Sequence, residues 1–313
     1  MSSSVADPSP PTTDTDAIPR PDSREFEALI DEIAWDARRR RDDGGSEGPF
    51  AAIDSVRRAR LGAARVPASL GGGGWTVTEL LDAVVSLAEA DPDVPHILRV
   101  HFAFVEELLR LPVDDPARVR WLPEIVAGAV FGGAASELSR HDVGGLRYDT
   151  TAADTEDGVV VDGRKFYSTG SLYSDYIRVT ARADDGEPLS VVVPAHAPGV
   201  EHVDDWDGIG QRHTGSGTTI FTGVEVGRDA VLPRRSDDPA SRPRHSLLQL
   251  HLHAIAAGIL RSVVTDAAAL LRSRKRTFTY ATSSVPVEDP QLLAVVGELT
   301  DRFRMTFVVA SNR

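Results

Sequence analysis

The sequence predicts an α+β fold, with an N-terminal α-helical domain, a middle antiparallel β domain and a partial C-terminal helical bundle. Apolar residues recur at helical spacing up to about residue 128 and again after about residue 234. Between these regions the chain is rich in β-branched residues and turn signals. Because helices, strands and helices follow one another in blocks, separate layers are favoured over βαβ alternation. The expected divisions are a disordered tail, the helical domain, the β domain and an incomplete helical domain, at residues 1–21, 22–128, 129–233 and 234–313.

The N-terminal domain is expected to contain five helices. Residues 1–21 are rich in Ser, Thr, Pro and Asp, and such a segment buries too little apolar surface to offset its ordering entropy. From Glu25 onward, apolar residues recur at positions typical of an amphipathic helix. The pair Asp91-Pro92 is typical of a helix entry, here that of the fourth helix. The expected helices cover residues 25–37, 53–61, 76–90, 94–111 and 116–127.

The middle region is expected to form short strands. Turn signals such as Asp162-Gly163, Asp185-Gly186 and Pro198-Gly199 separate the candidates, and their spacing is typical of an antiparallel sandwich or barrel. The candidate strands include residues 159–161, 176–180, 190–193 and 218–221. After a polar connector, helical spacing returns at residues 247–271 and 291–309.

Composition excludes several classes of function. The 313 residues contain no cysteine, so disulfides, thiolate metal sites, iron–sulfur clusters and a Cys nucleophile are all excluded. The formal net charge of −13 argues against a protein that binds nucleic acid by neutralising phosphates. No run of about 18 apolar residues and no secretion signal are evident, so we expect neither membrane insertion nor export. The expected location is the cytoplasm.

Candidate metal and phosphate sites are weak. The aspartates of residues 204–207 resemble a calcium loop, but Gly208 comes too early and the terminal Glu is missing. The glycines of residues 71–74 follow no clear strand, which favours a turn over a phosphate loop. His96 and His101 lie about 140° apart around a helix and cannot readily bind one metal ion. The sequence therefore predicts no metal site.

A stronger candidate is the segment Gly163-Arg-Lys-Phe-Tyr-Ser-Thr-Gly170. It is typical of a hairpin that places an aromatic ring beside two hydroxyl groups. An aromatic face can pack on a flat heterocycle such as an isoalloxazine, and a hydroxyl or backbone N–H can reach its polar edge. The residues alone leave open the alternative of a solvated hairpin with a core phenylalanine.

Longer motifs around this segment resemble a known family. The run VVDGRKFYSTGSLYSDYIRVTA and the downstream DDWDGIGQR and TGSGTT motifs resemble the acyl-CoA dehydrogenase-like flavoproteins, in the dibenzothiophene and sulfur-assimilation monooxygenase branch. VPASLGGGGW resembles the family's turn after the second helix, and FGGAASELS resembles the strand before its flavin loop. The resemblance spans about residues 25–310.

The resemblance implies roles for five residues. Phe166 takes the place of the aromatic beside the flavin, Ser168 that of the hydroxyl near flavin N5, and Ser136 that of a flavin-facing hydroxyl. Trp206 falls near the ring or the substrate, with a buried core indole as the alternative. His101 falls on the substrate pocket, where a histidine could shuttle a proton during oxygen transfer, with a packing role as the alternative.

Two arginines and the end of the chain complete the expectations. Arg274 and Arg276 end a predicted helix, where cations complement the helix dipole, and the resemblance implies that one of them reaches the flavin phosphate of a neighbouring subunit. The chain resembles only the first two of the four helices in the family's third domain. The part without a counterpart usually supplies the catalytic glutamate of true acyl-CoA dehydrogenases, and a complete bundle implies a homo-oligomer, a homotetramer in the family.

The function that the resemblance implies is a two-component flavin monooxygenase. In it a separate flavin reductase supplies reduced FMN, and O2 is used to oxygenate a small organosulfur or amine substrate. Two alternatives stay open: an acyl-CoA dehydrogenase that uses FAD, and a non-catalytic, truncated flavoprotein.

Overall fold

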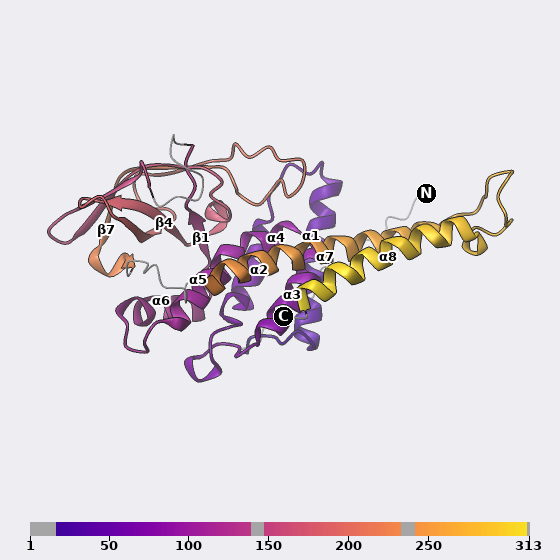
Figure 1. Ribbon diagram of the computed structural model, residues 1–313, viewed down its shortest axis with the longest axis horizontal. Coiled ribbons are helices and arrows are strands. Elements are labelled where there is room, and N and C mark those ends of the chain that lie inside the picture. Colours follow the sequence, from indigo (N-terminus) through magenta and orange to yellow (C-terminus); the bar gives the residue numbers. More distant parts are fainter. Residues whose placement is uncertain (1–16, 139–146, 233–241, 312–313) are drawn as a thin grey trace, which may run out of the picture.

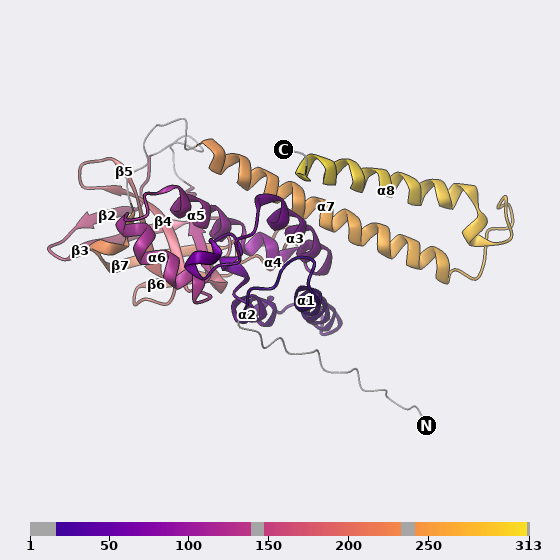
Figure 2. The ribbon, with the colours of Figure 1, turned by 90° about the horizontal axis from the view of Figure 1, so that it is seen from below.

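The computed structural model describes residues 17–138, 147–232 and 242–311, and its three parts are arranged along one axis. A group of short helices occupies the centre, a sheet lies at one end, and a long pair of helices extends from the other (Figures 1 and 2). This order of helices, strands and helices is the α+β arrangement that the sequence predicts.

The N-terminal helices pack around one apolar core. Three of them begin with capping side chains: Ser23 caps α1, Thr76 and Glu79 form a capping box on α3, and Asp115 caps α6. The predicted fourth helix divides at Leu98 into two helices, α4 and α5. The helices are α1 (Arg24–Asp42), α2 (Phe50–Arg58), α3 (Val77–Ala90), α4 (Asp93–Ile97), α5 (Arg99–Arg110) and α6 (Pro116–Val126).

Part of the predicted disordered tail is packed. Residues 1–16 lie outside the described residues, but Ile18 is 9% exposed and belongs to the hydrophobic core. Arg20, close to it in the chain, forms an ion pair with Glu79 on α3. The expectation of disorder is wrong for residues 17–21, because an apolar side chain and an ion pair hold this short segment against the helices.

The middle strands form one sheet, in the order β6-β7-β3-β2-β4-β5-β8 with β1 paired to β4. Most neighbours are antiparallel, as predicted, but β1 and β2 both run parallel to β4. The two parallel pairs are possible because other strands intervene in the chain before β4 and allow the crossover that parallel pairing requires. The strands are β1 (Phe131–Ala134), β2 (Thr151–Asp154), β3 (Gly158–Lys165), β4 (Tyr176–Ala183), β5 (Pro188–Pro194), β6 (Val200–Val203), β7 (Thr218–Gly227) and β8 (Val231–Leu232).

The C-terminal region is a pair of long helices, α7 (Arg242–Ser273) and α8 (Pro290–Ser311). The first half of α7 packs against α3 and α5, where Ala254, Ile255 and Ala257 are buried. Beyond this contact the pair extends away from the rest of the molecule (Figures 1 and 2). By length and composition alone, Ser246–Ser273 is apolar enough to cross a membrane, a test that the core helix of a soluble protein also passes.

Candidate functional site

The predicted site lies where β3 ends and meets the segment after β1. The backbone N–H of Phe166 donates to the carbonyl of Ser136 at 2.9 Å, which forms an isolated bridge between the two segments. Ser136 is exposed and the Phe166 ring is half-buried. The structure thus brings together two residues that lie 30 positions apart and were both expected at a flavin.

Tyr167 occupies a strained position in the turn that follows. Its φ is +55°, a left-handed conformation that is an outlier for a bulky side chain. Such residues persist only where the surroundings impose them, and they cluster at ligand sites. The bend leaves the Tyr167 side chain 57% exposed and turns Ser168 inward, where it is fully buried. The exposed aromatic ring of the turn is therefore that of Tyr167, which the sequence did not single out.

The expected direct contact between Ser168 and a ligand is not supported by this geometry. The Ser168 side chain is 0% exposed, and its hydroxyl is a buried polar atom without a hydrogen-bond partner among the described residues. Its backbone N–H donates to the carbonyl of Gly217 at 3.1 Å. The local bend at Tyr167 explains the difference, because simple strand alternation would have placed Ser168 on the same face as Phe166.

A chain of hydrogen-bonded hydroxyl groups supports the turn that carries Tyr167. The hydroxyls of Thr169 and Ser216 lie 2.9 Å apart, and those of Ser216 and Thr214 lie 2.7 Å apart. Thr214 in turn donates to the carbonyl of Gln211 at 3.1 Å. These contacts join the two motifs that are separated by more than 40 residues, and they hold the strained turn in place.

Trp206 stands beside the turn and is not a core indole. Its ring is half-buried and lies edge-on to Tyr167, with the ring centroids 6.1 Å apart. The indole N–H donates to the carbonyl of Gln211 at 3.0 Å, which fixes the orientation of the ring. Gln211 has a φ of +52°, so the loop that carries Trp206 is strained in the same way as the turn that carries Tyr167.

His101, the expected catalytic residue, is a packing residue in this structure. It is fully buried, its Nε2–H donates to the carbonyl of Gly62 at 2.9 Å, and its Nδ1 accepts from the backbone N–H of Phe131 at 3.2 Å. Burial lowers its pKa to about 4, so the ring is neutral at physiological pH. Both ring nitrogens are engaged by backbone groups, which leaves neither for a substrate.

Another histidine, His96, reaches the site instead. It is half-buried on α4, and its Nδ1 contacts the side-chain oxygen of Gln211. Burial and the neighbouring charge of Arg99 lower the pKa of His96 to about 4. The sequence reasoning missed His96 as a site residue, and its position three residues before Arg99 in the chain is the signal that could have pointed to it.

A buried ion pair fixes the segment next to Ser136. Lys165 is 0% exposed, and its Nζ lies 2.6 Å from a carboxylate oxygen of Glu137. The same carboxylate accepts the backbone N–H groups of Asp149 at 2.6 Å and Thr150 at 3.0 Å. Lys165 therefore joins the end of β3 to the chain on both sides of residues 139–146, which lie outside the described residues.

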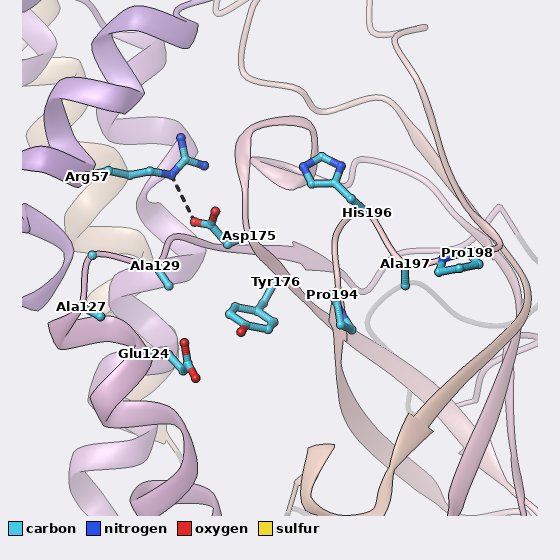
Figure 3. Close-up of a pocket in the computed structure, with 11 residues that line it drawn as sticks. Arg57, Glu124, Ala127, Ala129, Asp175, Tyr176, Pro194, His196, Ala197 and Pro198 are labelled. Atoms are coloured by element: carbon cyan, nitrogen blue, oxygen red, sulfur yellow. Dashed lines mark hydrogen bonds and ion pairs between the residues drawn. The ribbon is translucent and has the colours of Figure 1, made fainter.

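A separate cavity of about 770 Å³ lies between α6 and the strands β4 and β5, and none of the predicted site residues lines it (Figure 3). Its charged groups already have partners. Arg57 pairs with Asp175 at 3.1 Å, and Asp175 also accepts the backbone N–H of Val130 at 2.8 Å. Glu124 pairs with Arg120 at 2.8 Å. The Arg57–Asp175 pair joins the helical domain to the sheet, whereas the Glu124–Arg120 pair lies within α6, so we assign the charged groups of this cavity a structural role.

Arg274 and Arg276 lie in the connection between α7 and α8, at the end of the molecule opposite the sheet (Figure 1). Both are exposed, and the Nε of Arg274 donates to the carbonyl of Arg276 at 2.8 Å. Within one chain they do not approach Phe166. A flavin contact from either arginine therefore requires a second subunit, as the resemblance implies.

The residues at the turn fit a flavin. Tyr167, Phe166 and Trp206 present aromatic surface beside an exposed serine hydroxyl, on backbone whose strain is typical of ligand sites. The Ser168 hydroxyl of the same turn is buried and has no hydrogen-bond partner among the described residues. In the described residues no group of three or more His, Cys, Asp or Glu side chains could hold a metal ion.

The chain is similar to several known proteins. Residues 136–224 match the model of the acyl-CoA dehydrogenase middle domain. Dibenzothiophene monooxygenase of Mycolicibacterium goodii is 30% identical over 78% of this chain and 61% of its own length. The probable FMNH2-dependent monooxygenase SfnC of Pseudomonas putida is 24% identical over 90% of this chain and 69% of its own length.

A solved structure shows the same fold. FMN-bound TdsC of Paenibacillus sp. A11-2 has a TM-score of 0.82 and 26% identity, over 93% of this chain and 75% of TdsC. The chain spans 61% and 66% of the length of two dibenzothiophene monooxygenases that it matches. The chain belongs to the acyl-CoA dehydrogenase-like family, in the branch that contains dibenzothiophene monooxygenase and TdsC.

Proposed function

We propose that the chain is the oxygenase component of a two-component flavin monooxygenase. A separate flavin reductase supplies reduced FMN, and the substrate is a small organic molecule oxygenated at sulfur or nitrogen. The proposal is supported by relatives named as monooxygenases and by the likeness to FMN-bound TdsC. The observation that carries it is the strained, exposed Tyr167 between Phe166 and the buried Ser168.

The protein's own contribution is to position a planar ring and to limit water. When bound, reduced FMN supplies the electrons that activate O2. Tyr167 and Phe166 offer aromatic contact to such a ring, and Trp206, held by Gln211, closes one side of the turn. Ser136 offers an exposed hydroxyl to a polar edge. The hydrogen-bonded hydroxyls of Thr169, Ser216 and Thr214 keep the turn rigid, so these contacts need little rearrangement on binding.

Binding and turnover test the proposal separately. Purified protein should quench the fluorescence of FMN on binding, and oxygen uptake should require both reduced FMN and an organosulfur compound. A chain that folds but binds neither oxidised nor reduced FMN refutes the proposal. Reduction of bound flavin by an acyl-CoA without a reductase would instead favour a dehydrogenase.

We further propose that the protein acts in the cytoplasm as a homo-oligomer, a homotetramer as expected for the family, in which the α7–α8 pair of one subunit reaches the sheet of another. Large apolar side chains on this pair and on its connection support subunit contact: Leu270, Phe278, Tyr280 and Met305 are 71%, 79%, 96% and 72% exposed. In such an assembly Arg274 or Arg276 would bind the flavin phosphate of the neighbour. Sedimentation of the wild type and of Arg274→Ala and Arg276→Ala variants, with FMN affinities measured alongside, tests both parts.

A further inference from the structure

Arg99 carries a buried positive charge that the described residues do not balance. It is the first residue of α5 and is half-buried. Its Nε is shielded from solvent and has no hydrogen-bond partner in the described part of the chain. Burial lowers the pKa of the guanidinium, and no acidic group among the described residues acts against the shift. An ionised group in this position costs free energy unless an anion accompanies it.

This arrangement differs from that of other buried arginines within residues 17–138, 147–232 and 242–311. Each of three such arginines faces a carboxylate, in a protein whose net charge of −13 makes carboxylates abundant. The three pairs, with their N···O distances, are Arg40 with Asp36 at 2.8 Å, Arg65 with Glu106 at 2.6 Å and Arg178 with Glu107 at 3.0 Å. A shortage of carboxylates therefore does not explain the unbalanced charge of Arg99.

The groups described around Arg99 do not supply a negative charge. His96 lies one helical turn before it, and His251 of α7 donates through Nε2 to the carbonyl of Pro95 at 2.8 Å. Burial, followed by the charge of Arg99, leaves His96 with a pKa of about 4, and burial also lowers the pKa of His251 to about 4. Both rings are consequently neutral near pH 7, and the guanidinium remains the charged group of the cluster.

The cluster adjoins the proposed flavin site. A Cβ on Gly133 would lie 2.7 Å from the Val100 side chain, and one on Gly170 would lie 2.7 Å from the carbonyl of Ile97. These two glycines, on β1 and on the turn after Ser168, thus allow the junction of α4 and α5 to pack directly on the site. His96 makes a second link through Gln211, whose carbonyl also holds Trp206.

We infer that the Arg99 guanidinium binds the anionic group of the small-molecule substrate, a carboxylate, sulfinate or sulfonate. The inference rests on the proposed function, since it assigns a substrate class to the same site. A guanidinium matches a planar or tetrahedral oxyanion through paired N–H donors, and a half-buried position strengthens that interaction. The substrate would then be held by its charged end at Arg99, with its oxidisable atom directed to the turn at Tyr167.

Matched probes test this inference without turnover. Benzenesulfinate and methyl phenyl sulfone have similar size and shape, and only the first is charged. Calorimetry on the full chain should show that the anion binds roughly ten- to a hundredfold more tightly, as expected for one charge-assisted contact. Arg99→Leu should abolish the preference and Arg99→Lys should retain part of it. Arg110→Leu, at the exposed other end of the same helix, is the matched control and should bind as the wild type does.

Several outcomes would overturn the assignment of a substrate anion to Arg99. Equal binding of both probes by the wild type, or an unchanged preference in Arg99→Leu, overturns it. A loss of FMN affinity in Arg99→Leu with riboflavin affinity unchanged also overturns it, because the guanidinium would then hold the flavin phosphate. Failure of the wild type to bind FMN refutes the proposed function but leaves the probe measurement on Arg99 decisive. Since Arg99→Leu removes an unbalanced charge, its melting temperature should equal or exceed that of the wild type, which excludes misfolding as the cause.

Discussion

Replacing Asp93 by asparagine should stabilise the protein at neutral pH. Asp93 begins α4, the helix that carries His96, and it is 8% exposed, with one carboxylate oxygen that lacks a hydrogen-bond partner among the residues that the structure describes. Burial, and then the negative charge of Asp91, raise the pKa of Asp93 from 3.8 to about 6. Asp91 itself is balanced by Arg40, so the two neighbouring carboxylates have opposite effects on stability.

The magnitude follows from the raised pKa. Between pH 3.8 and 6 the folded state holds the Asp93 proton more tightly than the unfolded state does, so stability decreases as pH rises through this range. Above pH 6 the ionised carboxylate destabilises the fold by about 3 kcal/mol, at ~1.36 kcal/mol per pKa unit. Asparagine is neutral at every pH. The gain from Asp93→Asn should therefore be about 3 kcal/mol at pH 7.5 and about 1 kcal/mol at pH 4.5.

Urea unfolding followed by circular dichroism at the two pH values measures this gain. Asp91→Asn is the matched control, and it should destabilise the protein by roughly 3–5 kcal/mol because it leaves Arg40 with an incomplete set of partners. A gain from Asp93→Asn that is the same at pH 7.5 and pH 4.5, or no gain at pH 7.5, would refute the assignment of a raised pKa to Asp93.

Three further predictions concern the site and its support. Tyr167→Gly relieves the backbone strain of a left-handed tyrosine and should change the free energy of unfolding by less than about 1 kcal/mol. Loss of the ring should weaken FMN binding about five- to tenfold, and an unchanged FMN affinity in a fluorescence titration would show that the ring does not touch the flavin. Lys165→Met leaves the carboxylate of Glu137 buried without its cation and should lower stability by about 3–5 kcal/mol in urea unfolding, and the double variant with Glu137→Gln should recover part of the loss. The ring resonances of His101 should not shift in NMR spectra between pH 5.5 and 8, because the pKa of this group is about 4. The stability linked to His101 is present above pH 6.5 and is lost as pH falls toward 4, and a titration midpoint of the ring near pH 6.5 would contradict its burial.

Much of the architecture followed from the sequence because it depends on local patterns. The spacing of apolar residues located α1, α3 and α6 to within a few positions, and capping residues such as Ser23 and Thr76 lie at their starts. Turn signals separated β3, β4 and β5 correctly. The KFYSTG and TGSGTT motifs pointed to the segments that meet at the candidate site, since those motifs are contiguous in the chain.

The tertiary structure decided which side chain at each motif faces solvent. Neither the left-handed bend at Tyr167 nor the burial of Ser168 can be read from strand alternation, because contacts 40 and more residues away impose them. The same holds for His101, whose backbone partners at Gly62 and Phe131 lie on other elements. It also holds for Arg99, since the charge balance of a buried cation depends on every element that packs there. Local sequence sets the conformational preferences of each segment, whereas burial and charge balance are properties of the assembled neighbours.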